Sequence, residues 1–326
     1  MSPRLHPSLL REARSIHKCL PLLLPECRTI QQAKQELKWL IDGFGSSSNK
    51  LQRACIKRYR HVPLQYILGS QPFGSLDIQC KKHVLIPRWE TEEWSLNLSN
   101  SLKKSMNSMN SMKLNNDWNI VDLCSGTGCI PLLVIKETKK LFVMNSLKVN
   151  AIDCSPFAIN LTNLNFKRNF NNGLNLKNCN ISFNTHKLNI LNEVKVKKFI
   201  SGDLMNRKIN ILTCNPPYIP PLEFINDVRS SVRMYEPKLA LLGNLEFYKN
   251  LCFTWIKLDL IESFVYEIGE LSQASYVQQN VPHTWVTGVT YDSNNKPRCI
   301  FGYNKTTSTN YSTIFNNFLD ESYHPQ

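Results

Sequence analysis

The sequence predicts an α/β fold in which a mostly parallel sheet is closed by an antiparallel pair of strands, behind a small helical domain. Three features favour this fold. From residue 119 onward, short apolar runs alternate with stretches of helical periodicity, as in parallel βαβ units. The first of these runs leads through a glycine turn at 124–128 into a helix. Residues 285–291 and 298–303 flank a segment with the composition of a hairpin turn.

The first 19 residues are basic, poor in acids and apolar at near-helical spacing. Such a pattern is typical of a mitochondrial transit segment. It fits equally well a basic amphipathic first helix of the folded domain, so both interpretations stay open. The first predicts a protein of the mitochondrial matrix, with the cytoplasm as the alternative. The charged residues are Arg4, Arg11, Glu12, Arg14 and Lys18.

Helical patterns continue to about residue 70. The clearest runs from Thr29 to Phe44, where Thr29 and Gln32 form a capping-box pair and glycines mark the end. A second amphipathic stretch spans 51–60. We therefore expect residues 20–70 to form a small helical domain.

The next segment changes period. Apolar residues nearly alternate at 73–80 and resume at 84–86 after a polar turn, which predicts a β-hairpin linker over 71–87. A helix is expected to open at Pro87, because the acids of its first turn suit the helix dipole. The main domain would then occupy 88–303.

Two segments carry no predicted chemistry. Residues 100–118 are rich in Ser, Asn, Lys and Met, and we expect a flexible or frayed insertion there. Residues 304–326 are expected to form a polar tail.

The strand over 119–123 and the loop after it predict a nucleotide-type site. Gly126 and Gly128 permit a tight turn and close approach of a ligand to the backbone, and Asp122 could anchor the loop or a ligand ammonium. A second strand ends in Asp153, whose carboxylate can accept two hydrogen bonds from ribose hydroxyls. The loop lacks a Gly-Lys-Ser/Thr sequence, and its glycines are too sparse for a dinucleotide fingerprint. An adenosyl ligand without phosphates, S-adenosylmethionine, fits better.

The alternation continues to residue 268. A parallel sheet closed by an antiparallel pair is the arrangement of class I S-adenosylmethionine-dependent methyltransferases, a Rossmann-like fold. The predicted elements are a helix over 156–170, a third strand over 181–191 with Asn189 at its end, a fourth strand over 209–214, a helix over 245–257 and a fifth strand over 263–268.

The fourth strand must end at Asn215, because Pro216 and Pro217 cannot donate to a sheet ladder. A carboxamide, free carbonyls and the ring of Tyr218 are thus held at the carboxyl edge of the sheet. If the oxygen of Asn215 and the carbonyl of Pro216 each accept one N–H, they orient a poor nitrogen nucleophile and stabilise its developing charge without a general base. Tyr218 could stack on a flat substrate group. The alternative is a merely structural proline turn, which the surrounding fold disfavours.

Composition limits the possible partners. A formal charge of +14 suits acidic surfaces or nucleic acid, but the charge of the compartment or a solvated surface explains it equally well. The 11 cysteines are scattered without a CxxC pair, so the sequence predicts neither a disulfide framework nor a metal site. No apolar run approaches the roughly 18 to 20 residues that cross a bilayer, and we expect a soluble protein without membrane contact.

Several separate segments together resemble one enzyme family, the release factor glutamine N5-methyltransferases of the HemK/PrmC type, and in particular a mitochondrial member. The resemblance covers roughly 59–303. It implies methyl transfer from S-adenosylmethionine to the glutamine of the Gly-Gly-Gln loop in a class I release factor, with S-adenosylhomocysteine as product. The segments that carry it are 63–69, 72–74, 85–92, 122–130, 215–219, 236–237 with 239–241, and 267–269 with Gln273.

The resemblance also assigns the site. The helical domain would bind the protein substrate, and we expect a monomer without a metal or stable nucleic-acid binding. The catalytic residues would be Asn215, Pro216, Pro217 and Tyr218. The cofactor-binding residues would be Asp122, Cys124, Ser125, Gly126, Thr127, Gly128, Asp153, Asn189, Ile190 and Asn215.

The sequence departs from the family pattern at three positions. Cys124 replaces the first loop glycine, and Asn189 and Asn210 replace acids. Asn189 can still bind an adenine amine through its carbonyl, so we expect a working site with altered cofactor affinity. Two rival functions remain: a nucleic-acid amine methyltransferase of the N6-adenine type, which uses a similar clamp, and a non-enzymatic adaptor with a vestigial site. The intact Asn215 and Asp153 disfavour the adaptor.

Overall fold

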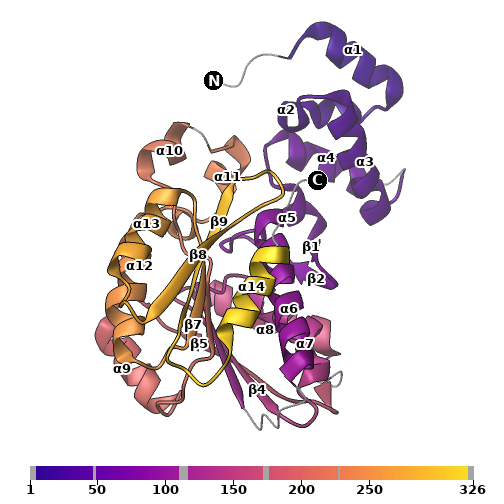
Figure 1. Cartoon of the computed structure of the whole chain (residues 1–326). Helices are drawn as coiled ribbons and strands as arrows, with labels where there is room; N and C mark the ends of the chain where they lie inside the picture. Colours follow the sequence, from indigo (N-terminus) through magenta and orange to yellow (C-terminus); the bar gives the residue numbers. More distant parts are fainter. Residues whose placement is uncertain (1–4, 47–48, 110–116, 172–175, 227, 322–326) are drawn as a thin grey trace.

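A computed structural model describes residues 5–46, 49–109, 117–171, 176–226 and 228–321 of the chain (Figure 1). Its main domain is built on a seven-stranded sheet of order β5-β4-β3-β6-β7-β9-β8. The strands β3 to β7 are parallel, and β9 runs antiparallel to both β7 and β8. This order confirms the predicted class I methyltransferase arrangement. The strands are β3 Trp118–Leu123, β4 Ser146–Asp153, β5 Asn180–Lys187, β6 Ile211–Cys214, β7 Ser263–Glu267, β8 Trp285–Tyr291 and β9 Pro297–Asn304.

Helices cover both faces of the sheet, because successive strand residues point to opposite sides. Ile120 packs into a core with α6, α7 and α14, whereas its neighbour Val121 packs into a second core with α9, α12 and α13. The first group of helices is α6 Trp89–Met109, α7 Cys129–Thr138 and α14 Tyr311–Glu321, with α8 Pro156–Phe170 packed beside α7. The second group is α9 Glu193–Gly202, α12 Glu246–Asn250 and α13 Leu271–Asn280.

The short elements complete this domain. The helix predicted over 245–257 is interrupted, since α12 passes into a π-helical segment and then a 3₁₀ turn. These two are η5 Leu251–Trp255 and η6 Ile256–Leu258, and the remaining short helices are η2 Lys139–Leu141, η4 Lys238–Ala240, α10 Pro221–Asn226 and α11 Ser230–Tyr235.

Two of the expected unstructured segments are helical. Residues 100–109 continue α6, with Leu102 and Ser105 buried, while 110–116 lie outside the described residues. The prediction of a polar tail over 304–326 is likewise wrong for residues 311–321, because these residues form the helix α14. Apolar residues at i, i+3, i+4 and i+7 bury one face of α14 against α6 and β9, which its polar flanks obscured in the sequence. They are Tyr311, Ile314, Phe315 and Phe318.

The linker hairpin is shorter than expected. Its strands are β1 Ser70–Phe73 and β2 Leu76–Gln79, so the turn lies at residues 74–75 and not at 81–83. Gly74 has a φ of 56°, which favours glycine there. Residues 84–86 form no strand; side chains hold them instead, since Tyr66 donates to the Val84 carbonyl at 2.8 Å.

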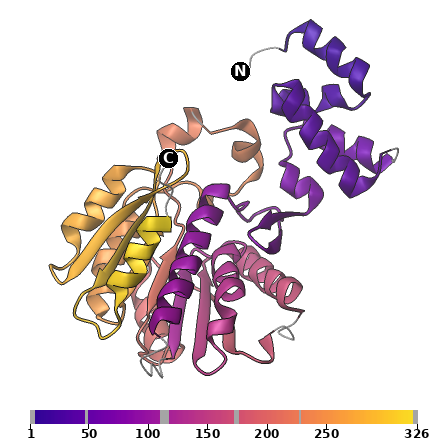
Figure 2. The same ribbon diagram turned by 45° about the vertical axis from the view of Figure 1, so that its right-hand side comes forward.

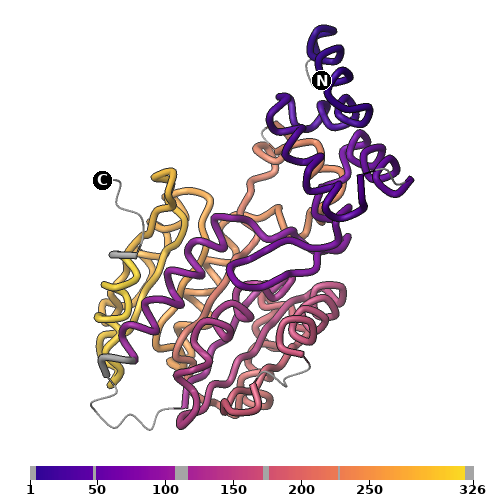
Figure 3. Tube along the Cα trace, turned by 90° about the vertical axis from the view of Figure 1, so that its right-hand side faces the viewer, coloured from indigo at the N-terminus to yellow at the C-terminus, as the bar shows by residue number. Residues whose placement is uncertain are grey.

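The N-terminal helices form a domain with its own core, which stands apart from the sheet (Figures 2 and 3). Thr29 caps α3 by accepting the Gln32 N–H at 3.2 Å. The buried Arg58 donates to Glu36 at 2.7 Å. Ala13 of α1 is fully buried in this core, so the folded helices begin before residue 20. They are α1 Pro7–Ile16, η1 Leu20–Leu22, α2 Leu24–Cys27, α3 Ile30–Phe44, α4 Asn49–Tyr59 and α5 Leu64–Leu68.

The segment α10–α11 extends from the sheet toward the N-terminal domain (Figure 2). Tyr235, at the end of α11, donates its hydroxyl to the Arg60 carbonyl at 2.8 Å. None of the described helices has the length and apolarity that crossing a membrane requires.

Candidate active site

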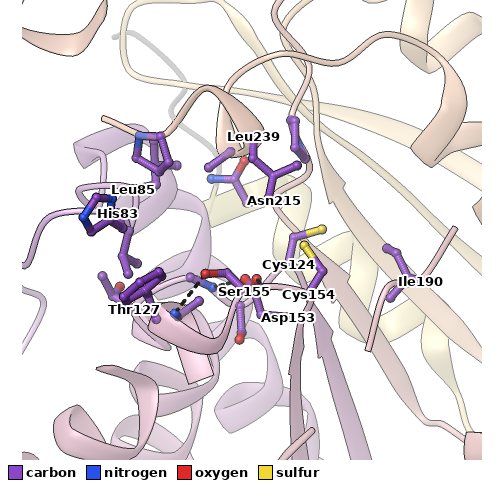
Figure 4. A pocket seen from close by; sticks show the side chains of 18 of the residues that line it. His83, Leu85, Cys124, Thr127, Asp153, Cys154, Ser155, Ile190, Asn215 and Leu239 are labelled. Atoms are coloured by element: carbon purple, nitrogen blue, oxygen red, sulfur yellow. Dashed lines mark hydrogen bonds between the residues drawn. The ribbon is translucent and has the colours of Figure 1, made fainter. Parts of the chain in front are cut away.

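A cavity of about 500 Å³ lies at the carboxyl edge of the sheet. Loops that follow four neighbouring strands line it with residues 124–127, 153–158, 188–191, Asn215 and Pro217, and the linker residues 83–85 and 87–88 close one side. Figure 4 shows Asp153 and Ser155 below the cavity, Asn215 above it and Ile190 to one side. In parallel sheets a ligand binds at this edge, at the point where the strand order reverses. Here the reversal lies between the neighbouring strands β3 and β6.

Main-chain groups hold the loop between β3 and α7. The Gly126 N–H donates to one carboxylate oxygen of Asp153 at 2.9 Å, and the Ser155 N–H donates to the other at 2.8 Å. Gly128 has a φ of 80° and is packed so closely on Thr162 that an added Cβ would lie 2.8 Å from its methyl group. The predicted turn is therefore closed around the carboxylate of Asp153.

The carboxylate of Asp153 lines the cavity and has lone pairs beyond the two that accept from Gly126 and Ser155. Burial raises the pKa of this carboxylate, while the backbone N–H donors of Ser155 and Gly126 oppose that rise. A carboxylate offers about four lone-pair sites, of which these two bonds occupy two. Its remaining lone pairs could accept the two ribose hydroxyls that the sequence predicts.

Asp122 does not line the cavity. It is fully buried beside Thr213 of β6, whose hydroxyl donates to it at 2.7 Å, and its other oxygen has no hydrogen-bond partner among the described residues. Burial raises its pKa to about 8. Asp122 therefore ties β3 to β6 below the loop, and a direct contact with a ligand ammonium remains a prediction.

The loop after β5 forms an apolar wall. Ile190 is buried, and the side-chain amide of Asn250 donates to its carbonyl at 2.9 Å, which holds this wall in place. The side-chain oxygen of Asn189 accepts the Leu191 N–H at 3.0 Å. That bond occupies one of the oxygen's two lone pairs, so the expected contact with an adenine amine can use only the other. Phe247, which the sequence did not suggest, completes the wall.

The predicted clamp divides between two cavities. Asn215 and Pro217 line the first, whereas Pro216 and Tyr218 face a second cavity of about 550 Å³ between the two domains. The Pro216 carbonyl accepts no hydrogen bond from the described residues. The proposed clamp needs this carbonyl to be available to the substrate. The ring of Tyr218 lies on Gly269, where an added Cβ would come within 2.8 Å, and its hydroxyl donates to Glu267 at 3.0 Å.

The two cavities meet at Asn215. Both are lined by Leu85, Arg88, Asn215 and Ala240. Arg88 donates at 2.8 Å to Glu236, which is 5% exposed and also accepts the Ile86 N–H at 3.1 Å. These bonds fix the linker segment at the junction. Asn215 therefore lies beside both a group bound in the second cavity and a ligand bound in the first.

The structure therefore brings most of the predicted site residues to these two adjoining cavities. Gly128 shapes the loop without lining the cavity, and Thr91 and Glu267 support the clamp without having been assigned a role from the sequence. No group of three or more His, Cys, Asp or Glu side chains suited to a metal occurs in the part of the chain that the structure describes.

Comparison with known proteins found no matching family model. The chain is 42% identical over 310 residues to the mitochondrial MRF1 N(5)-glutamine methyltransferase MTQ1 of Saccharomyces cerevisiae, covering 93% of this chain and 90% of the relative. It is 34% identical to the probable mitochondrial counterpart of Schizosaccharomyces pombe, over 86% of this chain and 91% of that one. A release factor glutamine methyltransferase of Clostridium acetobutylicum is 30% identical, over 68% and 69%.

Proposed function

The chain belongs to the family of release factor glutamine methyltransferases, and we propose that it methylates the side-chain amide nitrogen of the glutamine in the Gly-Gly-Gln loop of a class I release factor. The observation that carries the proposal is the position of Asn215, whose amide side chain belongs to the lining shared by the two cavities, together with Leu85, Arg88 and Ala240. Family membership favours this protein substrate over a nucleic-acid amine.

The first cavity suits S-adenosylmethionine. Its apolar wall at Ile190 and Phe247 fits a flat base, and the spare lone pairs of Asp153 fit ribose hydroxyls. When bound, this cofactor supplies an electrophilic methyl group and leaves as S-adenosylhomocysteine. Ser125, Gly126 and Thr127 would present the loop backbone to it.

The second cavity would admit the glutamine-bearing loop. A glutamine amide is a poor nucleophile because its nitrogen lone pair is delocalised into the carbonyl. The Asn215 oxygen and the Pro216 carbonyl can each accept one of its N–H groups, which orients the nitrogen and stabilises the positive charge that develops on it. The N-terminal domain and the exposed Trp39 and Trp89 line the protein-facing side.

We further propose that the substrate is the mitochondrial release factor and that the enzyme acts in the matrix as a monomer. The names of two relatives and the basic pattern of residues 1–19 support a mitochondrial location. Residues of one chain line both cavities, which supports the monomer. A fluorescent fusion to residues 1–19 should enter mitochondria; a cytosolic fusion would show that these residues are insufficient as a signal.

Mass spectrometry tests the reaction. The purified enzyme is incubated with labelled S-adenosylmethionine and either the mitochondrial release factor or a version whose Gly-Gly-Gln glutamine is replaced by alanine. We expect one methyl group on that glutamine and none on the variant. An unmodified glutamine, or equal labelling of an adenine-containing oligonucleotide, would contradict the proposal.

A further inference from the structure

A chain of hydrogen bonds runs from the clamp into the protein interior. Asn215 lines both cavities and Thr91 lines the first, whereas Glu267 lines neither. The Asn215 amide nitrogen donates to the Thr91 hydroxyl at 3.1 Å, and that hydroxyl donates to Glu267 at 2.7 Å. We propose that Glu267, acting through Thr91, turns the Asn215 amide so that its oxygen faces the substrate. Glu267 and Thr91 are then positioning residues. This inference rests on the proposed function, because it is the glutamine nitrogen that needs the Asn215 oxygen.

The donors and acceptors in this series of hydrogen bonds allow only one direction of donation, from Asn215 through Thr91 to Glu267. An ionised carboxylate only accepts hydrogen bonds, so the single hydroxyl hydrogen of Thr91 is given to Glu267. The oxygen of Thr91 can then only accept from Asn215, which must offer its NH2 group. Turning the amide by 180° would place two acceptors against each other. The orientation that follows from the network leaves the Asn215 oxygen available to a ligand.

Trp94 independently requires that the Glu267 atom facing Thr91 be a hydrogen-bond acceptor. Its indole N–H can only donate, and it donates at 2.8 Å to the Glu267 oxygen that also accepts from Thr91. The other carboxylate oxygen accepts the Tyr218 hydroxyl. Even a neutral amide in place of Glu267 would have to put its oxygen, and not its nitrogen, toward Trp94 and Thr91.

Hydrogen-bond donors and a nearby positive charge offset part of the cost of burying the Glu267 carboxylate. Glu267 and Thr91 are each 1% exposed. Burial raises the pKa of Glu267, while hydrogen bonds from Trp94, Thr91 and Tyr218 and the positive charge of Arg298 oppose that rise. Three donors on one carboxylate satisfy a charge that would otherwise be costly to bury.

The secondary structure explains how these groups meet. Phe264 and Tyr266 of β7 point into the core beneath α12 and α13, so the alternate residue Glu267 points to the opposite face, toward α6. Thr91 and Trp94 stand three residues apart in the first turns of α6 and therefore share one side of that helix. Asn215 follows β6, the neighbour of β7 in the sheet.

A pair of substitutions at Thr91 separates positioning from packing. Thr91→Val keeps the shape but removes the hydroxyl, whereas Thr91→Ser keeps the hydroxyl. For Thr91→Val we expect kcat to fall by about tenfold or more, the scale of one lost interaction of this kind, with KM for the release factor and Kd for the cofactor within about threefold of wild type. Thr91→Ser should stay within about threefold in all three constants.

Glu267→Gln provides a second, matched test. Trp94 forces the new amide to present its oxygen to Thr91, so the direction of the chain survives and kcat should fall less than in Thr91→Val. Thermal unfolding of each variant serves as the control for folding. A folded Thr91→Val enzyme with wild-type kcat, or Thr91→Ser and Thr91→Val losing kcat and cofactor binding equally, would overturn the inference.

A measurement without substrate separates this inference from the proposed function. In protein labelled with ¹⁵N at asparagine, the side-chain NH2 signals of Asn215 are those that disappear in Asn215→Ala. They should shift and exchange faster with solvent in Thr91→Val and remain in place in Thr91→Ser. Unchanged signals in Thr91→Val would refute the contact whatever the substrate. Wild-type enzyme that fails to methylate a release factor would instead refute the proposed function.

Discussion

The cofactor loop and the amide clamp lie at the same edge of the sheet but are held in different ways. The loop is closed by the N–H groups of Gly126 and Ser155 on Asp153, all within the first two βα units. The clamp depends on side chains that are far apart in sequence: Thr91 is 124 residues from Asn215, and Glu267 is 176 residues from Thr91. Apart from Asp153, on which it closes, the loop should therefore tolerate changes of side chain that the clamp does not.

The largest expected effect is at the clamp. Asn215→Ala removes the oxygen that accepts from the substrate nitrogen, and kcat should fall by roughly 100-fold or more, the usual scale for one preorganised transition-state partner. Cofactor affinity should change much less. Single-turnover methyl transfer and calorimetry measure the two. A folded Asn215→Ala enzyme working near the wild-type rate would reduce the clamp to a structural turn.

Asp153→Ala should instead act on the cofactor. It removes a charged acceptor that we assign to the ribose, and binding should weaken by about 2 kcal/mol. The same substitution leaves the Gly126 and Ser155 N–H groups unpaired. The free energy of unfolding of the protein without cofactor should therefore fall by roughly 1 to 3 kcal/mol. Asp153→Asn, which keeps one acceptor oxygen, is the control. Unchanged affinity by calorimetry would remove Asp153 from the binding site.

Tyr218 tests the boundary between the two regions. Its hydroxyl bonds to the buried Glu267, so Tyr218→Phe should cost about 1 kcal/mol of unfolding free energy, as for one typical hydrogen bond. Tyr218→Ala removes the ring as well and should mainly raise KM for the release factor, because contact with the substrate helps the ground state and the transition state alike. A fall in kcat with unchanged KM would assign Tyr218 to the chemical step.

The smallest effect is expected where the loop carries a side chain in place of glycine. Cys124 has a φ of 56°, a conformation that glycine adopts without strain. Cys124→Gly relieves that strain but raises the conformational entropy of the unfolded state. Because the two effects oppose each other, the free energy of unfolding should change by less than about 1 kcal/mol. Cofactor affinity should stay within about threefold. A loss like that of Asp153→Ala would show that the loop also depends on side chains other than that of Asp153.

Local patterns in the sequence determined most of the main domain. Apart from β5, in which polar and apolar residues alternate, the parallel strands are mostly apolar, and the long helices have a cap or period of their own. Gly126 and Gly128 suit the positive φ angles of the loop at 124–128. These properties depend on neighbours along the chain, so the sheet, the cofactor loop and the clamp at Asn215 could be predicted. The apolar period of α14 was present as well, but the polar residues around it obscured it.

Tertiary structure alone decided what surrounds these elements. Nothing in the sequence near Thr91 or Glu267 relates them to Asn215, because their contact depends on which face of β7 points toward α6 and on where α6 begins. The meeting of two cavities at Leu85, Arg88 and Asn215 likewise depends on how the N-terminal domain is held against the sheet. Hydrogen bonds and cavities formed by distant segments are set by packing in three dimensions, which no local pattern encodes.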